Sequence, residues 1–597
     1  MVKLTINNIP VEAREGELLI EVARRAGITI PSLCYMRGVH KQGACRICVV
    51  EVEGARTLQV SCLTPVRDGM VVRTNTGKVR HARKVLYELM LSDHPQDCLA
   101  CSRNLNCEFQ SLGRMLGVDN SRFQGERAVG KPDTSVSVTR DMSKCVLCRR
   151  CVTTCGKIQK VNVLGAQKRG FDAEIAPAAG LPLGSADCAF CGQCTVVCPV
   201  GALKETGAVN EIWAALNSDK RKIVQVAPAV RVAIAEEFGA PAGTRCTGKL
   251  AAALRRLGFD DVFDTNFAAD LTIMEEGTEL LHRLTSALTK KEGAHEKPAA
   301  LPMITSCSPG WVKYIEHRFP DELNHLSTCK SPHTMLGAVI KTFYADTINV
   351  KPQNMCVVSI MPCTAKKFEI SRPEMENRGA RNVDAVLTTR ELADMIKSAG
   401  IDFMSLPDEG FDNPLGMSTG AADIFGLTGG VMEAALRTVY ELVTGRELPF
   451  DGLHVTPIVG LGQVKEASLT IEKPLAAYKF LGGVTLRVAV TSGLDGAGQL
   501  MSAVAKGESP YHFIEVMGCP GGCITGGGQP RSTDPEARAK RLANLYAEDE
   551  SKPLRKSHEN PYIHTLYKDF LGKPCGHLSH ELLHTHYTKR GSYNNFK

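Results

Sequence analysis

The sequence predicts a multidomain protein that combines α+β and α/β regions. At 597 residues the chain is too long for one hydrophobic core, so roughly three to five domains are expected. Most of its 23 cysteines lie in tightly spaced groups before residue 205. After residue 220, short apolar runs typical of strands alternate with helical stretches. The composition is 43% hydrophobic and 23% charged, and a net charge of +7 is too small to indicate nucleic-acid or membrane binding.

The sequence predicts six segments in chain order. The opening residues alternate like two strands around a turn and become helix-like over 18–25. The next stretch looks helical but is broken by "DHPQDCLACSRNLNC". We expect these parts to be followed by a polar connector, a cysteine-dense block, an α/β region and a charged, helical, His-rich tail. The expected boundaries are 1–78, 79–118, 119–140, 141–210, 211–530 and 531–597.

The cysteines indicate metal binding rather than disulfides. The first residues have no apolar secretory core, and no run of about 18 apolar residues predicts a membrane-spanning helix. A disulfide scaffold would be short and would carry a secretory signal. We therefore expect a cytoplasmic protein whose thiols hold metal.

The first cysteine group suits a [2Fe–2S] cluster. A C-x-x-C pair on a loop has one thiol before it and one after it. Structural zinc is the rival, since four thiolates also satisfy a tetrahedral site. The expected ligands are Cys34, Cys45, Cys48 and Cys62.

The second group combines a histidine with three cysteines. His94 precedes the C-x-x-C pair by about one helical turn, although a lone histidine is more often a surface or core residue. Three thiolates and one imidazole could hold a [4Fe–4S] cluster or zinc, and spacing alone slightly favours the cluster. The expected ligands are His94, Cys98, Cys101 and Cys107.

The strongest signal is a repeated C-x₂-C-x₂-C-x₃-C motif, "CVLCRRCVTTC" and "CAFCGQCTVVCP". In two-cluster ferredoxins the fourth cysteine of each run binds the other cluster. One [4Fe–4S] cluster should take Cys145, Cys148, Cys151 and Cys198, and the other Cys188, Cys191, Cys194 and Cys155. With the two groups above, fifteen cysteines and His94 fill four clusters with no ligand left over. Such a series conducts electrons toward a catalytic site.

Three later stretches carry cysteines in unusual contexts: "TSCSPGW" with Cys307, "MPCTAKKFE" with Cys363, and "EVMGCPGGCITGGGQP" with Cys519 and Cys523. The glycines of the last stretch would let backbone approach a bulky cofactor. A phosphate-binding loop is disfavoured, because no Lys-Ser/Thr pair follows.

Together these motifs resemble the [FeFe]-hydrogenases in their long form, and the resemblance covers nearly all of residues 1–530. The sequence is similar in particular to the hydrogenase subunit of multimeric, NAD(P)-linked, electron-bifurcating enzymes. The resemblance implies a β-grasp [2Fe–2S] domain, a small helical His/Cys₃ domain, a two-cluster ferredoxin-like domain and a large α/β domain. The last would hold the H-cluster, a [4Fe–4S] cubane joined to a two-iron subsite with CO, cyanide and a dithiolate amine.

The resemblance also implies residue roles. Cys363, Cys519, Cys523 and a thiolate from residues 304–311 would hold the cubane, with Cys523 bridging to the two-iron subsite. Lys366 would donate to a cyanide ligand, although "AKKFE" alone reads as a solvated lysine. Met361 and Met517 would pack the pocket, or could be plain core. Further cofactor contacts are expected at Pro228 and Ser331.

A buried metal also needs a proton route. Glu276 and Glu279 lie about one helical turn apart, and the resemblance places Ser327 between them. Inside an apolar helix such acids can have raised pKa values, whereas a solvated helix face is the rival interpretation.

Two further groups of residues match no ligand pattern. Cys246, Cys329, Cys356 and Cys575 read as core thiols, and the tail histidines His577, His580, His584 and His586 read as solvated or partner-docking rather than metal-binding.

The chain departs from the family at Cys307–Ser308, where catalytic members usually have two adjacent cysteines, one a cubane ligand and one a proton-passing thiol. Counting back from Trp311 places Ser308 at the ligand position. Serine is a poor iron–sulfur ligand, however, so we expect Cys307 to bind iron and Ser308 to lie near the proton path. Ala229 stands where many members have serine, which would remove one cyanide contact.

The expected function is the catalytic subunit of a cytoplasmic [FeFe]-hydrogenase that interconverts protons and H₂. It would exchange electrons with ferredoxin and with FMN and NAD(P) on partner subunits, because "GLGQVKEA" is no convincing dinucleotide fingerprint. Two alternatives remain: a non-catalytic relative, such as an H₂ sensor or iron–sulfur assembly factor, and the cluster-bearing subunit of a complex I-like NADH dehydrogenase.

Overall fold

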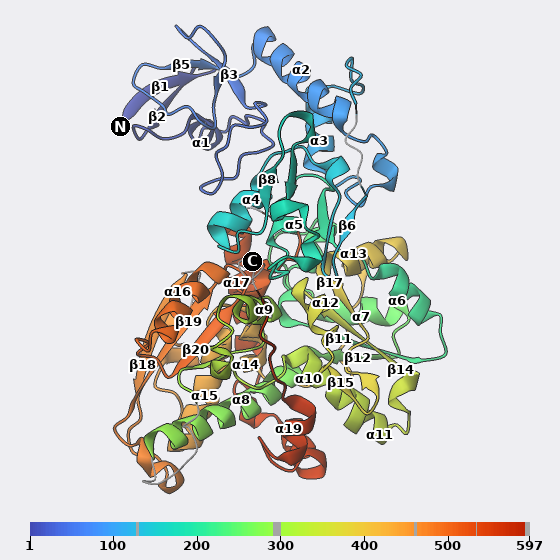
Figure 1. Cartoon of the computed structure of the whole chain (residues 1–597), viewed down its shortest axis with the longest axis vertical. Helices are drawn as coiled ribbons and strands as arrows, with labels where there is room; N and C mark the ends of the chain where they lie inside the picture. Colours follow the sequence, from blue (N-terminus) through green and yellow to red (C-terminus); the bar gives the residue numbers. More distant parts are fainter. Residues whose placement is uncertain (127–130, 290–299, 459–462, 533, 592–597) are drawn as a thin grey trace. The chain divides into compact units, whose positions relative to one another are not determined.

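The structure is a computed structural model that describes residues 1–126, 131–289, 300–458, 463–532 and 534–591 (Figure 1). Parts of the expected connector (127–130), of "GLGQVKEA" (460–462) and of the tail (533 and 592–597) lie outside the described residues. The chain forms two compact units. The first comprises residues 1–157, 162–186 and 197–204, and the second comprises 158–161, 187–196 and 205–597.

The first unit begins with the predicted hairpin and helix. Strands β1 (Val2–Ile6) and β2 (Ile9–Ala13) pair antiparallel, and α1 (Leu19–Arg25) follows. Leu4 and Ile6 of β1 and Leu19 and Val22 of α1 are buried in one apolar core. The sheet runs in the order β2-β1-β5-β3-β4, completed by β3 (Val49–Val52), β4 (Gln59–Val60) and β5 (Val71–Arg73).

The rest of the first unit consists of short elements around the cysteine groups. The helices α2 (Gly77–Asp93) and α3 (Glu108–Leu116) flank the predicted break. A three-stranded sheet of β10 (Leu203–Glu205), β7 (Val138–Arg140) and β6 (Asp133–Thr134) follows, with the hairpin β8 (Gly165–Gln167) and β9 (Glu174–Ala176). The motif cysteines that belong to this unit lie on its loops and in or beside its short helices.

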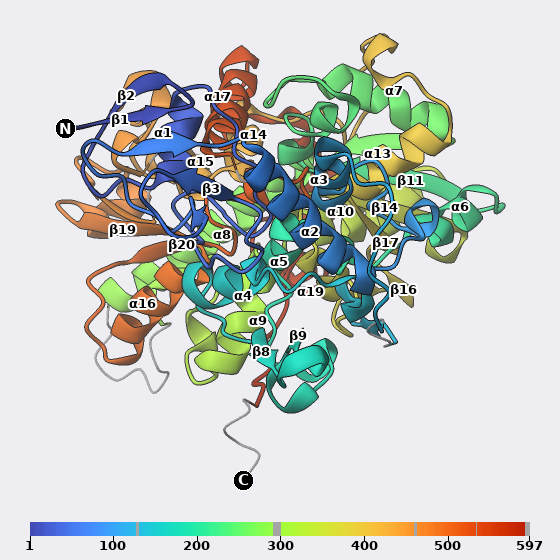
Figure 2. The ribbon, with the colours of Figure 1, turned by 90° about the horizontal axis from the view of Figure 1, so that it is seen from above.

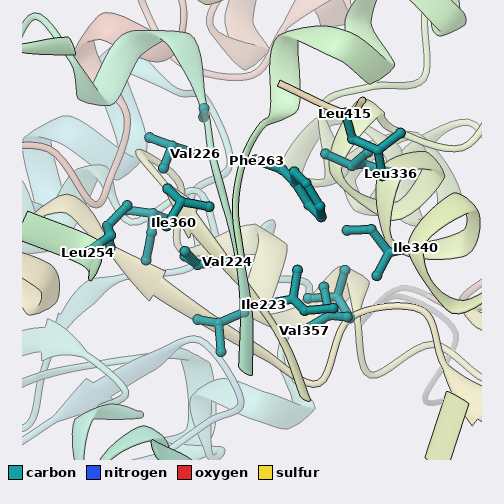
Figure 3. Close-up of a cluster of buried hydrophobic side chains, with 14 of the residues drawn as sticks. Ile223, Val224, Val226, Leu254, Phe263, Leu336, Ile340, Val357, Ile360 and Leu415 are labelled. Atoms are coloured by element: carbon teal, nitrogen blue, oxygen red, sulfur yellow. The ribbon is translucent and has the colours of Figure 1, made fainter. Parts of the chain in front are cut away.

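The second unit contains two four-stranded sheets and the short hairpin of β15 (Glu376–Asn377) and β16 (Ala380–Arg381). The first is parallel and runs β12 (Asp261–Asp264), β11 (Arg221–Val226), β14 (Met355–Met361) and β17 (Ala385–Thr388). Its strands are buried apart from the first two residues of β11, because α7 (Thr247–Leu257), α10 (Pro332–Val339) and α13 (Thr389–Ser398) cover the sheet with apolar side chains. Figure 3 shows this core, in which Val224, Ile360 and Leu336 come from three different elements.

The second sheet runs β13 (Met303–Ile304), β20 (Phe513–Met517), β19 (Thr485–Ser492) and β18 (Val464–Thr470), with β18 antiparallel at one edge. Figures 1 and 2 show α16 (Leu494–Ala505) on the same side of the unit as these strands. Apolar, mostly parallel strands that alternate with helices along the chain confirm the predicted mixed α/β region.

Further helices, long and short, belong to the second unit. They include α8 (Thr265–Leu288), α9 (Pro309–Arg318) and α15 (Gly430–Thr444), and in the tail α17 (Pro535–Ser551), α18 (Pro561–Leu566) and α19 (His577–Leu583). Within the described part of the chain, every helix is too short or too polar to cross a membrane.

Candidate metal centre

The thiols of the first group lie together in the first unit. Cys34, Cys45, Cys48 and Cys62 are all buried. The sulfur of Cys34 contacts those of Cys45 and Cys62, and Cys48 contacts Cys62. Four buried thiols in contact with one another are a fitting ligand set for a small cluster.

His94 meets its three expected thiol partners. A cavity of about 20 Å³ is lined by all four candidate ligands and by Lys144. Burial lowers the pKa of His94 to about 4, so the imidazole is neutral and can coordinate a metal. Its Nδ1 is buried and has no hydrogen-bond partner among the described residues. The site therefore offers an unpaired nitrogen beside three sulfurs.

One of the two ferredoxin-type ligand sets also converges. Cys145, Cys148, Cys151 and the distant Cys198 line a cavity of about 20 Å³. In the other set, Cys188, Cys191 and Cys194 belong to the second unit and Cys155 belongs to the first, so this set stays a prediction.

The largest of these cavities lies in the second unit and measures about 80 Å³. Many of the residues that line it come directly after the carboxyl ends of β11, β13, β14 and β20. Parallel strands of both four-stranded sheets therefore end at this cavity. Cys307, Cys363, Cys519 and Cys523 all line it. Chain segments more than 200 residues apart thus bring four thiols to one cavity. Pro228, Ala229, Met361, Met517, Ser308 and Lys366 line the same space.

Glycines let the last cysteine loop pack against the other segments. A Cβ on Gly526 would lie 2.1 Å from the carbonyl oxygen of Pro362, next to Cys363. A Cβ on Gly527 would lie 2.4 Å from the carbonyl oxygen of Cys191. Gly522 has a φ of 92°, and its Cβ would lie 2.7 Å from the Thr428 nitrogen. No other residue allows this approach, so the glycines hold the thiols of Cys519 and Cys523 near Cys363.

The cavity thiols need a cation to ionise. Burial raises the pKa of Cys523 to about 12 and raises those of Cys307, Cys363 and Cys519 as well. The free thiolates are therefore unfavourable here, whereas bound iron would deprotonate the sulfurs outright. Four thiols in an enclosed, mostly apolar cavity fit an iron–sulfur group.

Lys366 is buried rather than solvated, with 9% of its surface exposed. Its Nζ donates to Ser331 Oγ at 3.0 Å and to Glu369 Oε2 at 3.1 Å. The same carboxylate lies 2.8 Å from Nε2 of His333. Ser331 is absent from the residues that line the described cavity, and its contact is with Lys366. The ammonium group is thus held at the cavity wall by one anion and one hydroxyl.

The expected acids of the proton route are also buried, which excludes a solvated helix face. Glu276 is 1% exposed and Glu279 is 8% exposed. Burial, followed by the charge of Glu279, raises the pKa of Glu276 to about 8. Ser327 Oγ donates to Glu279 Oε2 at 3.0 Å, and Ser327 also lies close enough to Glu276 to lower the pKa of that carboxyl. The hydroxyl therefore lies between the two carboxyls.

Cys307 and Ser308 differ in their surroundings. Ser308 Oγ accepts a hydrogen bond from the Gly518 N–H at 3.1 Å, next to Cys519. Among charged neighbours, Glu276 has the largest effect on Cys307, and Cys523 comes next. Cys307 thus lies between the acids and the other thiols.

Several contributors were missed by the sequence reasoning. Glu369 and His333 complete the Lys366 network, and Thr265, Phe425 and Gly426 line the cavity. Only the i, i+3 spacing of Lys366 and Glu369 on one helix could have indicated the pair. The tail was also misread at one position: His584 is 8% exposed and is not solvated. It contacts Thr328 and Glu275, because the residues after α19 pair with residues 328–330.

Comparison with known families divides the chain into five matched parts. Residues 220–527 match the iron-only hydrogenase large subunit, C-terminal domain, and residues 535–590 match the iron hydrogenase small subunit. Residues 1–77 match a 2Fe-2S cluster-binding domain. Residues 83–122 match the iron–sulfur binding region of NADH-ubiquinone oxidoreductase G, and 135–204 the ferredoxin-like domain of NADH-quinone oxidoreductase subunit 3.

Individual relatives match over the full length. The chain is 51% identical to an NADP-reducing hydrogenase subunit of Solidesulfovibrio fructosivorans, covering 99% of both chains. It is 39% identical to iron hydrogenase 1 of Clostridium pasteurianum, covering 99% of this chain and 100% of that one. The solved structure of an [FeFe]-hydrogenase from Chlamydomonas reinhardtii is similar with a TM-score of 0.58 and 45% identity, over 65% of this chain and all of that one. A complex I-like subunit would explain only the first 205 residues, so that alternative is wrong. The chain belongs to the family of iron-only, or [FeFe], hydrogenases, and it is a hydrogenase.

Proposed function

We propose that this hydrogenase catalyses the reversible reaction 2H⁺ + 2e⁻ ⇌ H₂ in the cavity of the second unit, with electrons supplied through iron–sulfur clusters. One observation carries the proposal. Four cysteines from three distant segments line one cavity together with a buried lysine. A structural zinc site is closed by its four ligands and would need no buried lysine beside them.

The proposed cofactors are one [2Fe–2S] cluster in a β-grasp domain, three [4Fe–4S] clusters and one H-cluster with CO, cyanide and a dithiolate amine. When bound, the H-cluster supplies the redox-active iron at which protons and electrons combine. The approach of the Cys191 carbonyl to Gly527 supports assigning the Cys188–Cys191–Cys194 cluster as the electron donor to the H-cluster.

The side chains of the cavity have separate proposed tasks. Cys363, Cys519 and Cys523 anchor the cubane, and Cys307 supplies the fourth ligand. The Oγ of Ser308 supports this choice, because it already accepts the Gly518 N–H. Lys366, oriented by Ser331 and Glu369, donates to a cyanide ligand. Met361, Met517 and Pro228 exclude water from the cavity.

Protons are proposed to travel along Glu276, Ser327 and Glu279, with Ser308 near the inner end. Glu276 is protonated at neutral pH, because its pKa is raised to about 8. It can therefore release a proton inward and be reloaded through the Ser327 hydroxyl, which donates to Glu279.

The proposed partners are ferredoxin and flavin- and NAD(P)-binding subunits of a hetero-oligomer in the cytoplasm, with electron bifurcation between them. The name of the Solidesulfovibrio relative, an NADP-reducing hydrogenase subunit, supports the pyridine-nucleotide link. Residues 83–122 and 135–204 support a shared electron-entry module, since they match regions of NADH-quinone oxidoreductases.

The deciding experiment is anaerobic maturation of the chain, followed by infrared spectroscopy and an H₂ assay with reduced viologen. We expect absorption bands of metal-bound CO and cyanide together with H₂ evolution. Bands without turnover would contradict the catalytic assignment and favour an H₂ sensor. Absence of the bands after competent maturation would remove the two-iron subsite from the proposal.

A further inference from the structure

Polar side chains fasten the cysteine-bearing residues 188–196 to the last cysteine loop, and both segments belong to the second unit. Gln193 Nε2 donates to the Thr525 carbonyl at 2.8 Å. Thr195 Oγ1 lies within hydrogen-bond distance, 3.1 Å, of the Gly527 carbonyl oxygen. In each pair the two residues are 332 positions apart in the sequence. We call this contact between the two segments the electron-transfer junction.

One buried arginine joins the same two segments. Arg390, the second residue of α13, is 3% exposed. Its Nη2 donates to the Gly527 carbonyl at 2.7 Å and to Thr195 Oγ1 at 3.1 Å, and its Nη1 donates to the Gln529 carbonyl. The guanidinium therefore bridges a residue next to Cys194 and the glycine-rich end of the last cysteine loop.

Glu205 neutralises the buried charge of Arg390. Its two carboxylate oxygens accept hydrogen bonds from Nε at 2.9 Å and from Nη2 at 2.7 Å. Burial would raise the pKa of Glu205, but the charge and the hydrogen bonds of Arg390 outweigh it and lower the pKa. The ion pair holds the planar guanidinium in one orientation. A lysine would present one compact ammonium group, which cannot reach all of these acceptors from one position.

The junction matters because electrons have to pass between its two segments. The Phe190 N–H donates to Cys188 Sγ at 3.4 Å, a contact that suits a cluster-bound sulfur. The Cys191 carbonyl oxygen approaches Gly527 so closely that a Cβ there would lie 2.4 Å from it. Electron tunnelling falls steeply as two iron–sulfur centres move apart. The groups that hold residues 188–196 against the last cysteine loop therefore control the rate of transfer.

We propose that Arg390 is the positioning residue of the electron-transfer junction. Through Thr195 and the Gly527 carbonyl it fixes the separation between the cluster assigned to residues 188–194 and the H-cluster. During H₂ evolution one electron at a time leaves the first centre, which is oxidised, and enters the second, which is reduced. H₂ oxidation reverses the direction. The inference rests on the proposed function, because the H-cluster is part of it.

The test compares variants of the matured, full-length protein. Thr195→Val removes the hydroxyl that meets Arg390 with little change in shape, whereas Thr195→Ser keeps it. Arg390→Lys keeps the charge but loses the fork of donors. Arg437→Lys is the control, because Arg437 is also buried and paired with two carboxylates, those of Glu433 and Asp549. The hydrogen bonds of Arg437 go to neither segment of the junction.

The measurements separate electron transfer from the chemistry of H₂. The oxidised protein is mixed with H₂ in a stopped-flow cell, where bleaching of the iron–sulfur absorption reports electrons that leave the H-cluster. Exchange of D₂ with the protons of water reports H₂ cleavage and needs no electron to leave. Pulsed electron paramagnetic resonance reports the magnetic coupling between the two centres. The CO and cyanide infrared bands report maturation.

We expect Thr195→Val and Arg390→Lys to keep the infrared bands and the D₂ exchange of the wild type. Bleaching should slow several-fold in both variants, and the magnetic coupling should weaken, because the two centres are no longer held at the same separation. Thr195→Ser and Arg437→Lys should bleach at the wild-type rate.

Wild-type bleaching in Thr195→Val or in Arg390→Lys would overturn the inference. Equal slowing in Arg437→Lys would also overturn it, because lost stability alone would then explain the rates. So would an equal loss of exchange and bleaching, which would place the damage at the H-cluster itself. If Arg390→Lys fails to fold, the two Thr195 variants decide by the same criteria. A wild-type protein with neither bands nor D₂ exchange would instead overturn the proposed function.

Discussion

The hydroxyl of Ser308 accepts a hydrogen bond from the Gly518 backbone N–H, 210 residues later in the chain, at 3.1 Å. This contact ties the start of α9 to the loop that carries Cys519 and Cys523. The adjacent Cys307 instead has Glu276 and Cys523 as its leading charged neighbours. The two residues that depart from the family pattern therefore have distinct surroundings, and their roles can be separated.

The first prediction concerns iron binding by this pair. In the chain reconstituted with [4Fe–4S] clusters but lacking the two-iron subsite, Cys307→Ser should lose the catalytic-domain cubane, while Ser308→Ala should retain it. Ser308→Ala should also lower the free energy of unfolding by about 1–3 kcal/mol, because the buried Gly518 N–H loses its acceptor. Iron content and electron paramagnetic resonance measure the cubane. The reverse pattern would make Ser308 the ligand and would assign Cys307 to the proton path beside Glu276.

The second prediction concerns Glu276. Glu276→Gln should lower H₂ evolution about a hundredfold or more, because an amide cannot release a proton. Wild-type H₂ evolution should fall as the pH rises through about 8, where the carboxyl loses its proton. The charges that set this value are Glu279 and Glu515, which raise the pKa, and Arg283, which lowers it. Rate measurements over the pH range test this, and an unchanged rate in Glu276→Gln would exclude the residue from the path.

Stability should report the same group independently of activity. The folded pKa of Glu276 lies above its ordinary value of 4.5, so the folded state binds the proton more tightly. This contribution is fully present below that ordinary value and is lost as the pH rises through about 8. In Glu276→Gln the decline should be smaller, by at most about 1.4 kcal/mol per pH unit. Denaturant unfolding of the cofactor-free chain at several pH values measures it, and equal slopes in the two proteins would refute it.

The third prediction concerns the buried ion pair at the cavity wall. Lys366→Met should destabilise the cofactor-free chain by about 3–5 kcal/mol, because Glu369 would keep its buried charge with only His333 beside it. Adding Glu369→Gln should recover most of that loss. The double variant should nevertheless fail to show the CO and cyanide bands, since the ammonium donor is absent. Normal bands in the double variant would mean that Lys366 has only a structural role.

The fourth prediction concerns the close packing of the last cysteine loop. Gly526→Ala should cost about 1–3 kcal/mol and reduce iron in the catalytic domain, because the new Cβ would meet the Pro362 carbonyl 2.1 Å away. Gly410→Ala is the control, since a Cβ there would meet nothing within 4 Å. Thermal unfolding and iron analysis compare the two. Equal behaviour would show that the loop can shift without separating Cys523 from Cys363.

The fifth prediction concerns the histidine of the second cluster. His94→Ala should lose one [4Fe–4S] cluster, whereas His94→Cys should keep it with a lower reduction potential, because thiolate adds negative charge. His81→Ala, an exposed histidine on α2, should change neither property. Iron content and redox titration provide the measurements. Retention of all clusters in His94→Ala would show that His94 is not a cluster ligand.

Local spacing allowed much of the protein to be predicted. The hairpin and helix at the start of the chain and the alternating α/β region were confirmed, because period and turn residues are set within about 20 residues. The set Cys145, Cys148, Cys151 and Cys198 was predicted from the crossed pattern of the repeat, and these four thiols line one cavity. The family was recognised from the four cysteine groups together with the three later motifs.

By itself, then, the sequence determined which residues are able to bind metal and which elements carry them. Only the tertiary structure decided which distant groups meet. The pairing of Lys366 with Glu369 and His333, the N–H of Gly518 on Ser308, and the position of His584 beside Thr328 all depend on chain segments that pack together after folding. No periodicity encodes such contacts, because their energy comes from burial and hydrogen bonding between segments remote in sequence.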